Sequence, residues 1–181
     1  IIKHAIMELA NQRKRGHKVS FFVSLSGIAL QSEDLMVWIC DCLRSYKARG
    51  AWLIFQLKER DLRIHTQKAK TFIEHLNKIK CQISVDQYGT VSDPETLLKN
   101  LPIDYVKFDS SLITNLSKHQ DKQIKLNDLN EQAKINNVKT IATGVEDASS
   151  LALLWTTGVN YIQGYFLQEP SERITYDFSA V

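Results

Sequence analysis

The chain has 181 residues, of which 44% are hydrophobic and 24% are charged, and its formal net charge is +3 at pH 7. This length and composition are typical of one soluble globular domain with a substantial core, so we expect residues 1–181 to form a single domain. The small net charge gives no electrostatic argument for nucleic-acid binding, and no apolar run approaches the ~20 residues that a membrane span requires.

Apolar runs of strand length alternate along the chain with segments of helical periodicity. The opening residues, "IIKHAIMELANQRKRG", have the pattern of an amphipathic helix already under way, which favours a start inside a larger protein with other domains. The apolar runs then predict six strands, at residues 19–25, 51–57, 82–85, 105–108, 139–142 and 161–167.

Helical patterns occupy the segments between these strands. Ser32 is the predicted N-cap of one helix, and Asp61 has the same predicted role in the next. Three more helices are expected at residues 93–101, 113–136 and 147–158. In the last of them, Asp147 is the predicted cap and Gly158 the predicted end.

The last helix and the C-terminal segment also carry expectations about burial. Leu151, Leu154 and Trp155 form a stripe at helical spacing, which we interpret as the buried side of that helix. Residues 171–181 contain few core residues, and we expect them to form a tail that packs on the outside of the domain.

The cysteines favour a reducing compartment. Cys40, Cys42 and Cys81 form no CxxC pair, and the first two lie two residues apart on a predicted helix, so that they point to different faces. Reduced, structural thiols in a cytoplasmic protein are the expected state.

Strands that alternate with helices imply a parallel α/β sheet, either open or closed into a barrel. The runs "FFVSL" and "WLIF" are continuously apolar, as strands buried on both faces should be. A complete (β/α)8 barrel needs roughly 250 residues, so this chain would be a barrel without its first elements. Periodicity alone leaves the open sheet and the barrel as alternatives.

Polar residues follow the predicted strands at the end where parallel sheets bind ligands. They are Ser24, Ser26, Gln56, Glu59, Asp86, Gln87, Lys107, Asp109, Thr143, Glu146 and Gln163. No histidine is among them, and the chain contains no GxSxG, P-loop or GxGxxG motif. A metal hydrolase needs several converging carboxylates, whereas amides and hydroxyls dominate here.

Six segments together resemble the EAL domain family, whose active members cleave the bacterial second messenger cyclic di-GMP. They are "FFVSLS", "LIFQLKE", "ISVDQYGT", "LPIDYVKFDSSLI", "KTIATGVED" and "NYIQGYFLQEP", in the order and spacing of that family. The resemblance implies a (β/α)8 TIM-like barrel of the EAL type. The leading strand and helix, with the motif that names the family, would lie before residue 1.

The resemblance also implies an altered metal site. Asp86 corresponds to the first of the family's paired aspartates, whereas Gln87 replaces the second. Gln56 replaces a metal-binding glutamate, Ser24 a metal-binding asparagine and Thr143 another site glutamate. A neutral amide adds no negative charge, so the Asp86/Gln87 pair suits two divalent ions poorly. We therefore expect a degenerate domain with no catalytic residues, no metal and no required cofactor.

Other family positions are retained, and they predict a nucleotide-binding site. Lys107, which lies near the attacking water in active members, is present, as are Asp109, Glu59, Glu146, Gln163 and Gly164. The predicted nucleotide-binding residues are Asp86, Lys107, Thr143, Gly144, Gln163 and Gly164. Three structural alternatives stay open: Asp86 as a strand-end cap, Lys107 paired with Asp86 or Asp109, and ordinary barrel packing at Gln163 and Gly164.

A narrower resemblance links the chain to FimX-type proteins, which are multidomain regulators of type IV pili and twitching motility. It is carried by "QLKE", "DQYG", "VEDASSLALLWTTGVNYIQGYFLQ" and "YDF". Members bind cyclic di-GMP without cleaving it, and some dock a PilZ-type adaptor protein. Thr143 and Gly144 depart from the pattern, because those proteins place a glutamate and a bulky residue there to hold a guanine.

Three hypotheses follow: a silent cyclic di-GMP receptor, a protein-interaction module without the nucleotide, and an active phosphodiesterase.

Overall fold

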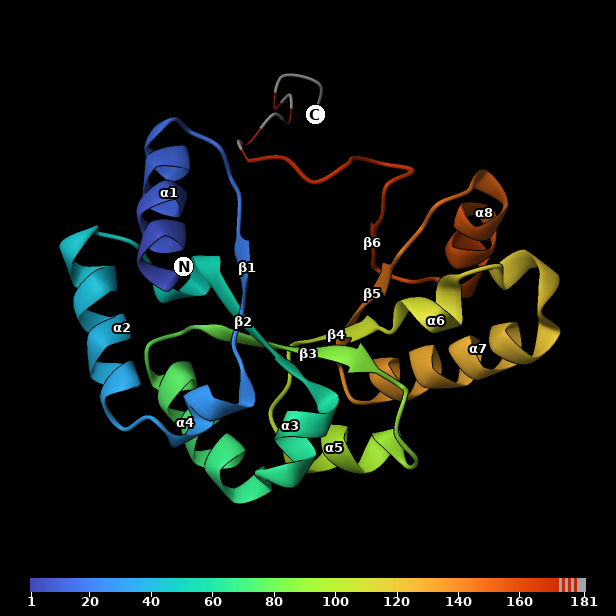
Figure 1. Ribbon diagram of the computed structural model, residues 1–181, viewed down its shortest axis with the longest axis horizontal. Helices are drawn as coiled ribbons and strands as arrows, with labels where there is room; N and C mark the ends of the chain where they lie inside the picture. Colours follow the sequence, from blue (N-terminus) through green and yellow to red (C-terminus); the bar gives the residue numbers. More distant parts are fainter. Residues whose placement is uncertain (173, 175, 177, 179–181) are drawn as a thin grey trace.

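Six parallel strands form one curved sheet in this computed structural model, which describes residues 1–172, 174, 176 and 178. In spatial and chain order they are β1 (Phe21–Ser24), β2 (Leu53–Lys58), β3 (Gln82–Tyr88), β4 (Tyr105–Phe108), β5 (Lys139–Thr143) and β6 (Tyr161–Gln163). Figure 1 shows the strands on the inside and the helices around the outside, as a half-barrel with β1 and β6 at its two edges. The predicted barrel-type α/β fold is confirmed, because a doubly wound sheet would carry helices on both faces.

Eight α-helices cover the outer face of the sheet. They are α1 (Ile2–Lys14), α2 (Asp34–Ser45), α3 (Glu59–Ile64), α4 (Thr66–Lys78), α5 (Pro94–Asn100), α6 (Ser110–Ile113), α7 (Gln120–Ile135) and α8 (Ala148–Thr157) in the described part of the chain. Short 3-10 helices span Gly27–Gln31, Gly50–Trp52 and Leu116–Lys118. Of the helices described, none has the length and apolar character needed to cross a membrane.

Strand side chains alternate between two separate apolar clusters. Residues that point outward, such as Phe55, Val85 and Val106, belong to the main core beneath the helices. Residues that point inward from β2, β4 and β5 form a second, small cluster of Ile54, Tyr105 and Ile141. The interior of the half-barrel therefore has an apolar floor, and the inward residues nearer the carboxyl ends of the strands are free to be polar.

Two predicted N-caps are wrong. Helix α2 begins at Asp34, with Glu33 at the N-cap position, because residues up to Gln31 already form a 3-10 helix and Ser32 caps the end of that helix. Asp61 lies inside α3, which starts earlier at Glu59.

Two predicted long helices are interrupted. The helix expected after Asp61 divides into α3 and α4 at His65, whose φ of −119° and ψ of 38° are not helical. The helix expected at residues 113–136 divides into α6, a 3-10 helix and α7, because Asn115 adopts a left-handed φ of 56°. A left-handed residue cannot continue a right-handed helix.

The expected boundaries of the last helix are confirmed, but its buried face is only partly correct. The Asp147 carboxylate accepts a hydrogen bond from the Ser150 N–H, and Gly158 ends the helix with a left-handed φ of 75°. Leu154 is fully buried and Leu151 is partly buried, whereas Trp155 is 70% exposed. The interpretation of Trp155 as a core residue is therefore wrong.

The chain beyond β6 also differs from expectation. The strand predicted at residues 161–167 ends at Gln163, and the Leu167 N–H donates to the Gly164 carbonyl within a turn. The tail predicted at residues 171–181 falls largely outside the described residues. Of the described part, Phe178 stacks on the His17 ring, with 4.0 Å between ring centroids.

Candidate functional site

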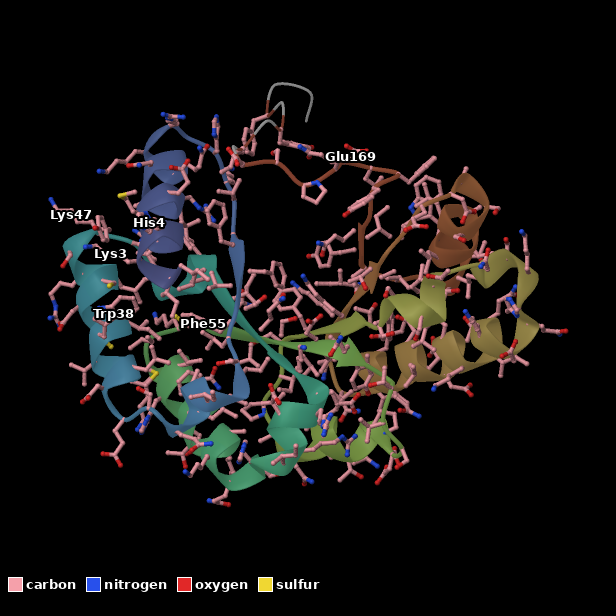
Figure 2. All side chains as sticks on the ribbon, in the orientation of Figure 1. Lys3, His4, Trp38, Lys47, Phe55 and Glu169 are labelled. Carbon is pink, nitrogen blue, oxygen red and sulfur yellow. The ribbon has the colours of Figure 1, made fainter. Side chains whose placement is uncertain are left out.

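An open pocket of about 990 Å³ lies at the carboxyl ends of the strands, inside the half-barrel. All six residues predicted to bind a nucleotide line it: Asp86, Lys107, Thr143, Gly144, Gln163 and Gly164. Gln56 and Ser110 also line it, as does the segment after β6. Figure 2 shows Glu169 on that segment, where the chain leads from β6 across the opening of the half-barrel.

Lys107 is the central cation of this pocket. Its side chain points inward from β4 and is only 8% exposed, and its Nζ donates to Oε1 of Gln163 at 3.1 Å. The Phe22 ring of β1 lies 4.7 Å from the same nitrogen and makes a cation–π contact. Among the described residues Lys107 forms no salt bridge within 4.0 Å, so the predicted alternative of pairing with Asp86 or Asp109 is not seen as a direct contact.

The electrostatic state of Lys107 follows from this burial. Desolvation lowers the pKa of the ammonium, and the negative charge of Asp86 partly offsets that effect. A buried ammonium without a bonded carboxylate is costly by itself. It is well placed to contact an anion that enters the pocket, because such a contact would supply the missing negative charge.

We expect Lys107→Met to raise the free energy of unfolding by about 1 kcal/mol at neutral pH, because it removes an unpaired buried charge. The difference in the free energy of unfolding between Lys107→Met and the unmodified protein should decrease as the pH rises toward 10.5. In that window the unfolded chain holds more protons than the folded chain, whose Lys107 pKa is lowered, so the stability of the unmodified protein increases with pH. Urea unfolding at several pH values measures this.

Lys139→Met is the matched control for that series, because Lys139 is exposed at the start of β5 and also lies over an aromatic ring, that of Tyr105. It should leave both the stability and its pH dependence nearly unchanged. A Lys107→Met variant whose stability difference stays constant from pH 7 to 10 would contradict the lowered pKa.

The β1 and β2 ends present neutral groups to the pocket. Nε2 of Gln56 donates to Oγ of Ser24 at 2.6 Å. Oε1 of Gln56 and Oγ of Ser84, which is adjacent in register, are both buried and accept or donate no hydrogen bond within the described structure. These groups can bind water or a polar ligand, but they contribute no charge to a metal site.

Asp86 and Gln87 do not converge. A register shift between Val85 and Tyr88 interrupts the β3–β4 pairing, and Gln87 adopts a left-handed φ of 56°. As a result Asp86 is half-buried in the pocket, whereas Gln87 is exposed and does not line it. The pair cannot act as two adjacent ligands of one ion.

The donor set does not fit a pair of divalent metal ions. Besides Asp86, the carboxylates that line the pocket are Glu146, Glu169 and Glu172, and all three are exposed. Nowhere in the described chain do three His, Cys, Asp or Glu side chains gather as metal ligands would. A two-metal centre needs several carboxylates around ions that lie ~3.5–4 Å apart.

Close backbone packing shapes the β5–β6 side of the pocket. Oγ1 of Thr143 donates to the Phe108 carbonyl at 2.7 Å, so this hydroxyl is already engaged. Gly144 has a left-handed φ of 74°, and a Cβ there would meet Cβ of Ser110 at 2.9 Å. A Cβ on Gly164 would meet the backbone oxygen of Val145 at 2.1 Å. The packing role proposed as an alternative for Gly164 is therefore present, whatever the pocket binds.

Two retained acids have structural positions. Glu59 is 1% exposed, forms an ion pair with Arg63 at 2.8 Å and accepts the Gly89 N–H at 2.9 Å, so it holds the turn after β3. The Asp109 carboxylate caps α6 by accepting the Ser111 N–H. Neither lines the pocket.

Phe22 was missed among the candidate residues, although it contacts Lys107. The alternation of inward and outward residues along "FFVS" could have found it, because Phe22 and Ser24 share one face of the strand.

Comparisons with known proteins agree on one family. The model of the EAL domain matches residues 1–170. A crystal structure of the FimX EAL domain superposes with a TM-score of 0.93 at 34% identity, and covers 98% of this chain and 71% of that one. The FimX EAL domain from Pseudomonas aeruginosa bound to c-di-GMP gives a TM-score of 0.91 at 33% identity, with the same coverage.

A curated relative is the cyclic di-GMP phosphodiesterase PdeF of Escherichia coli K12. It is 27% identical over 175 residues, which is 96% of this chain and 23% of that protein. The chain spans about a quarter or less of the length of the curated relatives it matches first.

Proposed function

The chain belongs to the EAL domain family, and from this premise we propose that it is a receptor for cyclic di-GMP that does not cleave the nucleotide. Members and relatives of the family bind or degrade this messenger. The receptor would be a regulatory module within a longer cytoplasmic protein that controls type IV pili and twitching motility.

One observation carries the proposal: a buried Lys107 that forms no salt bridge among the described residues, in a pocket where Asp86 is the only half-buried carboxylate. Cyclic di-GMP carries two phosphates and two guanines. The Lys107 ammonium can contact a phosphate, and the Gln163 amide beside it can form hydrogen bonds with a base edge. Asp86, 
 in the same pocket, is a carboxylate that can accept from guanine N–H groups.

The same donor set argues against hydrolysis. Gln56 and Thr143 engage neighbouring groups as neutral donors, and Gln87 turns away from the pocket. We infer that the domain requires no metal cofactor, because binding of the nucleotide through a lysine and amides needs none.

The pilus role rests on likeness to FimX EAL domains, at 33–34% identity. On the same ground we propose that a PilZ-type adaptor and other domains of the parent chain are its partners. If the nucleotide site has been lost, the alternative function is a protein-interaction module that retains only the adaptor surface.

Calorimetric titration with cyclic di-GMP tests the receptor. We expect no measurable binding by the 181-residue chain and weak, saturable binding by a chain extended at its N-terminus to the length of the FimX EAL domains. Micromolar affinity needs about 8 kcal/mol, which one lysine and a few amides do not supply. Thr143→Glu should strengthen binding if a guanine contact is what that position lacks.

Two results of the titration would count against the receptor. The first is absence of heat from the extended chain at millimolar nucleotide, which would favour the interaction module. The second is unchanged binding in Lys107→Met, because the proposal depends on that ammonium.

A further inference from the structure

The three segments that lead into β1, β2 and β3 are basic. These amino-end segments, residues 13–20, 46–52 and 78–81, contain eight lysines and arginines and no aspartate or glutamate. The eight are Arg13, Lys14, Arg15, Lys18, Lys47, Arg49, Lys78 and Lys80. All are exposed except Arg13, which is half-buried. Because parallel strands start at the same edge of a sheet, these cations share the end of the half-barrel opposite the carboxyl ends of the strands.

Direct contacts hold the three amino-end segments against one another. The guanidinium carbons of Arg13 and Arg49 lie 4.7 and 5.7 Å from the centre of the Trp52 ring, so two like charges share one indole. A Cβ on Gly50 would meet the Ile79 carbonyl oxygen at 1.9 Å, so the second segment also packs against the third. The cations therefore belong to one surface. Figure 2 shows Lys47 on it, beside the end of α2.

No carboxylate of the described chain neutralises this surface. None of the eight cations forms a salt bridge within 4.0 Å among the described residues, and Nε of Arg13 is buried there without a hydrogen-bond partner. Helix dipoles account for only part of the charge. Arg13, Lys14 and Lys78 lie in the last turns of α1 and α4, where cations are favourable, but this effect does not extend to the five cations beyond the helix ends.

Two of those five occupy backbone positions that disfavour lysine. Lys47 and Lys80 have left-handed φ values of 54° and 61° in the turns that end α2 and α4. The corresponding positions after α7 and α8 hold Asn137 and Gly158, which adopt this conformation more readily. A lysine there lowers the stability of the turn, and a role in binding an anion explains why it is present.

We propose that the amino-end segments form a docking surface for an anionic lipid bilayer, which the domain binds from one side without crossing it. A bilayer presents phosphate groups over a broad area, so it meets cations from three separate segments at once. Clusters of roughly four to eight lysines and arginines are typical of such surfaces. Ile135, 79% exposed where α7 leads toward the start of β5, adds an apolar side chain at the same end, which a bilayer interface accepts.

A single-stranded nucleic acid fits this surface less well. Such strands bind through bases that stack on open aromatic rings. The three rings of the amino-end segments are already engaged: Trp52 carries two guanidinium groups, His17 stacks on Phe178 at 4.0 Å between centroids, and Tyr46 packs against the main core. The cations are therefore available for phosphate contacts, but no ring is free to hold a base.

The charge of the opposite end fixes how the domain would sit on a bilayer. Asp86, Glu146, Glu169 and Glu172 line the pocket at the carboxyl ends of the strands. An anionic bilayer attracts the amino-end segments and repels these acids, so docking leaves the pocket facing the solvent. A small ligand could then enter the pocket while the domain is bound.

Vesicle sedimentation tests the docking surface. The unmodified chain is mixed with vesicles of phosphatidylcholine and phosphatidylglycerol in a two-to-one ratio, and with vesicles of phosphatidylcholine alone. We expect binding at least about 50-fold tighter to the anionic vesicles, because each cation near such a surface contributes about fivefold. Most of this binding should be lost at about 1 M salt, where the Debye length falls to about 3 Å.

Two quadruple variants separate the surface from net charge. The test variant combines Lys14→Gln, Arg15→Gln, Lys47→Gln and Lys80→Gln. The control combines Lys68→Gln, Lys70→Gln, Lys118→Gln and Lys125→Gln, which are exposed lysines outside the amino-end segments, and it lowers the net charge equally. We expect the test variant to bind anionic vesicles at least about 50-fold more weakly and the control to stay within about threefold, with unchanged circular dichroism in both.

Three results would overturn the proposal. The first is equal binding of the unmodified chain to the two kinds of vesicle, and the second is an equal loss of binding in the two quadruple variants. The third is tighter binding of a fluorescent single-stranded oligonucleotide than of the anionic vesicles, which would assign the surface to nucleic acid instead.

Discussion

A Gly164→Ala variant is expected to lose about 3 kcal/mol of stability, at the upper end of what overpacking typically costs. The added methyl group would lie 2.1 Å from the Val145 oxygen, 2.4 Å from its nitrogen and 2.7 Å from its carbonyl carbon. These are backbone atoms held by neighbours: the Val145 N–H donates to the Gln163 carbonyl, and the Phe166 N–H donates to the Val145 carbonyl. They cannot yield as the end of a flexible side chain can.

Thermal unfolding measures this loss, which should lower the midpoint by about 10 °C in a chain of this size. Gly16→Ala is the control, because Gly16 has a left-handed φ of 91° but nothing within 4 Å of the added methyl. It should cost only the conformational strain of about 1–2 kcal/mol. If Gly164→Ala were no less stable than Gly16→Ala, the close approach of the β5 and β6 ends described above would be wrong.

Gly164 also shows why the end of the last strand could not be predicted. The run "YIQGYFL" is rich in apolar and aromatic residues on both sides of the glycine, so the pattern predicts a strand through residue 167. The strand ends at Gln163 because the Gly164 backbone meets the backbone of Val145, which lies in the loop after β5. Contacts between segments that are distant in sequence leave no trace in local periodicity.

The start of α3 is a similar case. Both Glu59 and Asp61 are acids of a type found at helix starts, and local preference favours Asp61. The helix begins at Glu59 because that carboxylate binds the Gly89 N–H, thirty residues further along the chain, and Arg63 one turn away. Sequence periodicity did predict where the strands occur, since β4 matches residue for residue.

The candidate pocket was largely predictable, because carboxyl ends of parallel strands meet at one edge. That rule predicts from the sequence that Asp86, Lys107 and Gln163 lie together, and all three line the pocket. The orientation of Gln87 was not predictable, because it depends on the register shift after Val85. The exposure of Trp155 was not predictable either, because an apolar stripe on a helix does not reveal which of its members faces the sheet.

Cyclic di-GMP hydrolysis is expected to be undetectable with either magnesium or manganese, in the 181-residue chain and in the N-terminally extended chain. The metals act in such reactions by activating water and by neutralising the charge that develops on phosphate. Among the described residues that line the pocket, Asp86 is the only half-buried carboxylate. Its neighbour Gln87 is a neutral amide that is exposed and does not line the pocket. Gln56 donates its amide N–H to Ser24, so that a hydroxyl and an amide occupy the neighbouring strand ends.

The assay follows the linear dinucleotide product by chromatography over many hours, with a no-enzyme blank and with PdeF as a positive control. A rate at least a thousandfold below that of the control is expected, because one half-buried carboxylate lines the described pocket whereas a two-metal centre needs several. Metal-dependent turnover above the blank that survives in Lys107→Met but disappears in Asp86→Asn would show that one carboxylate suffices to bind the metal. That result would contradict the proposed receptor function and assign phosphodiesterase activity to the protein, because a site that hydrolyses cyclic di-GMP releases the product instead of keeping the nucleotide bound.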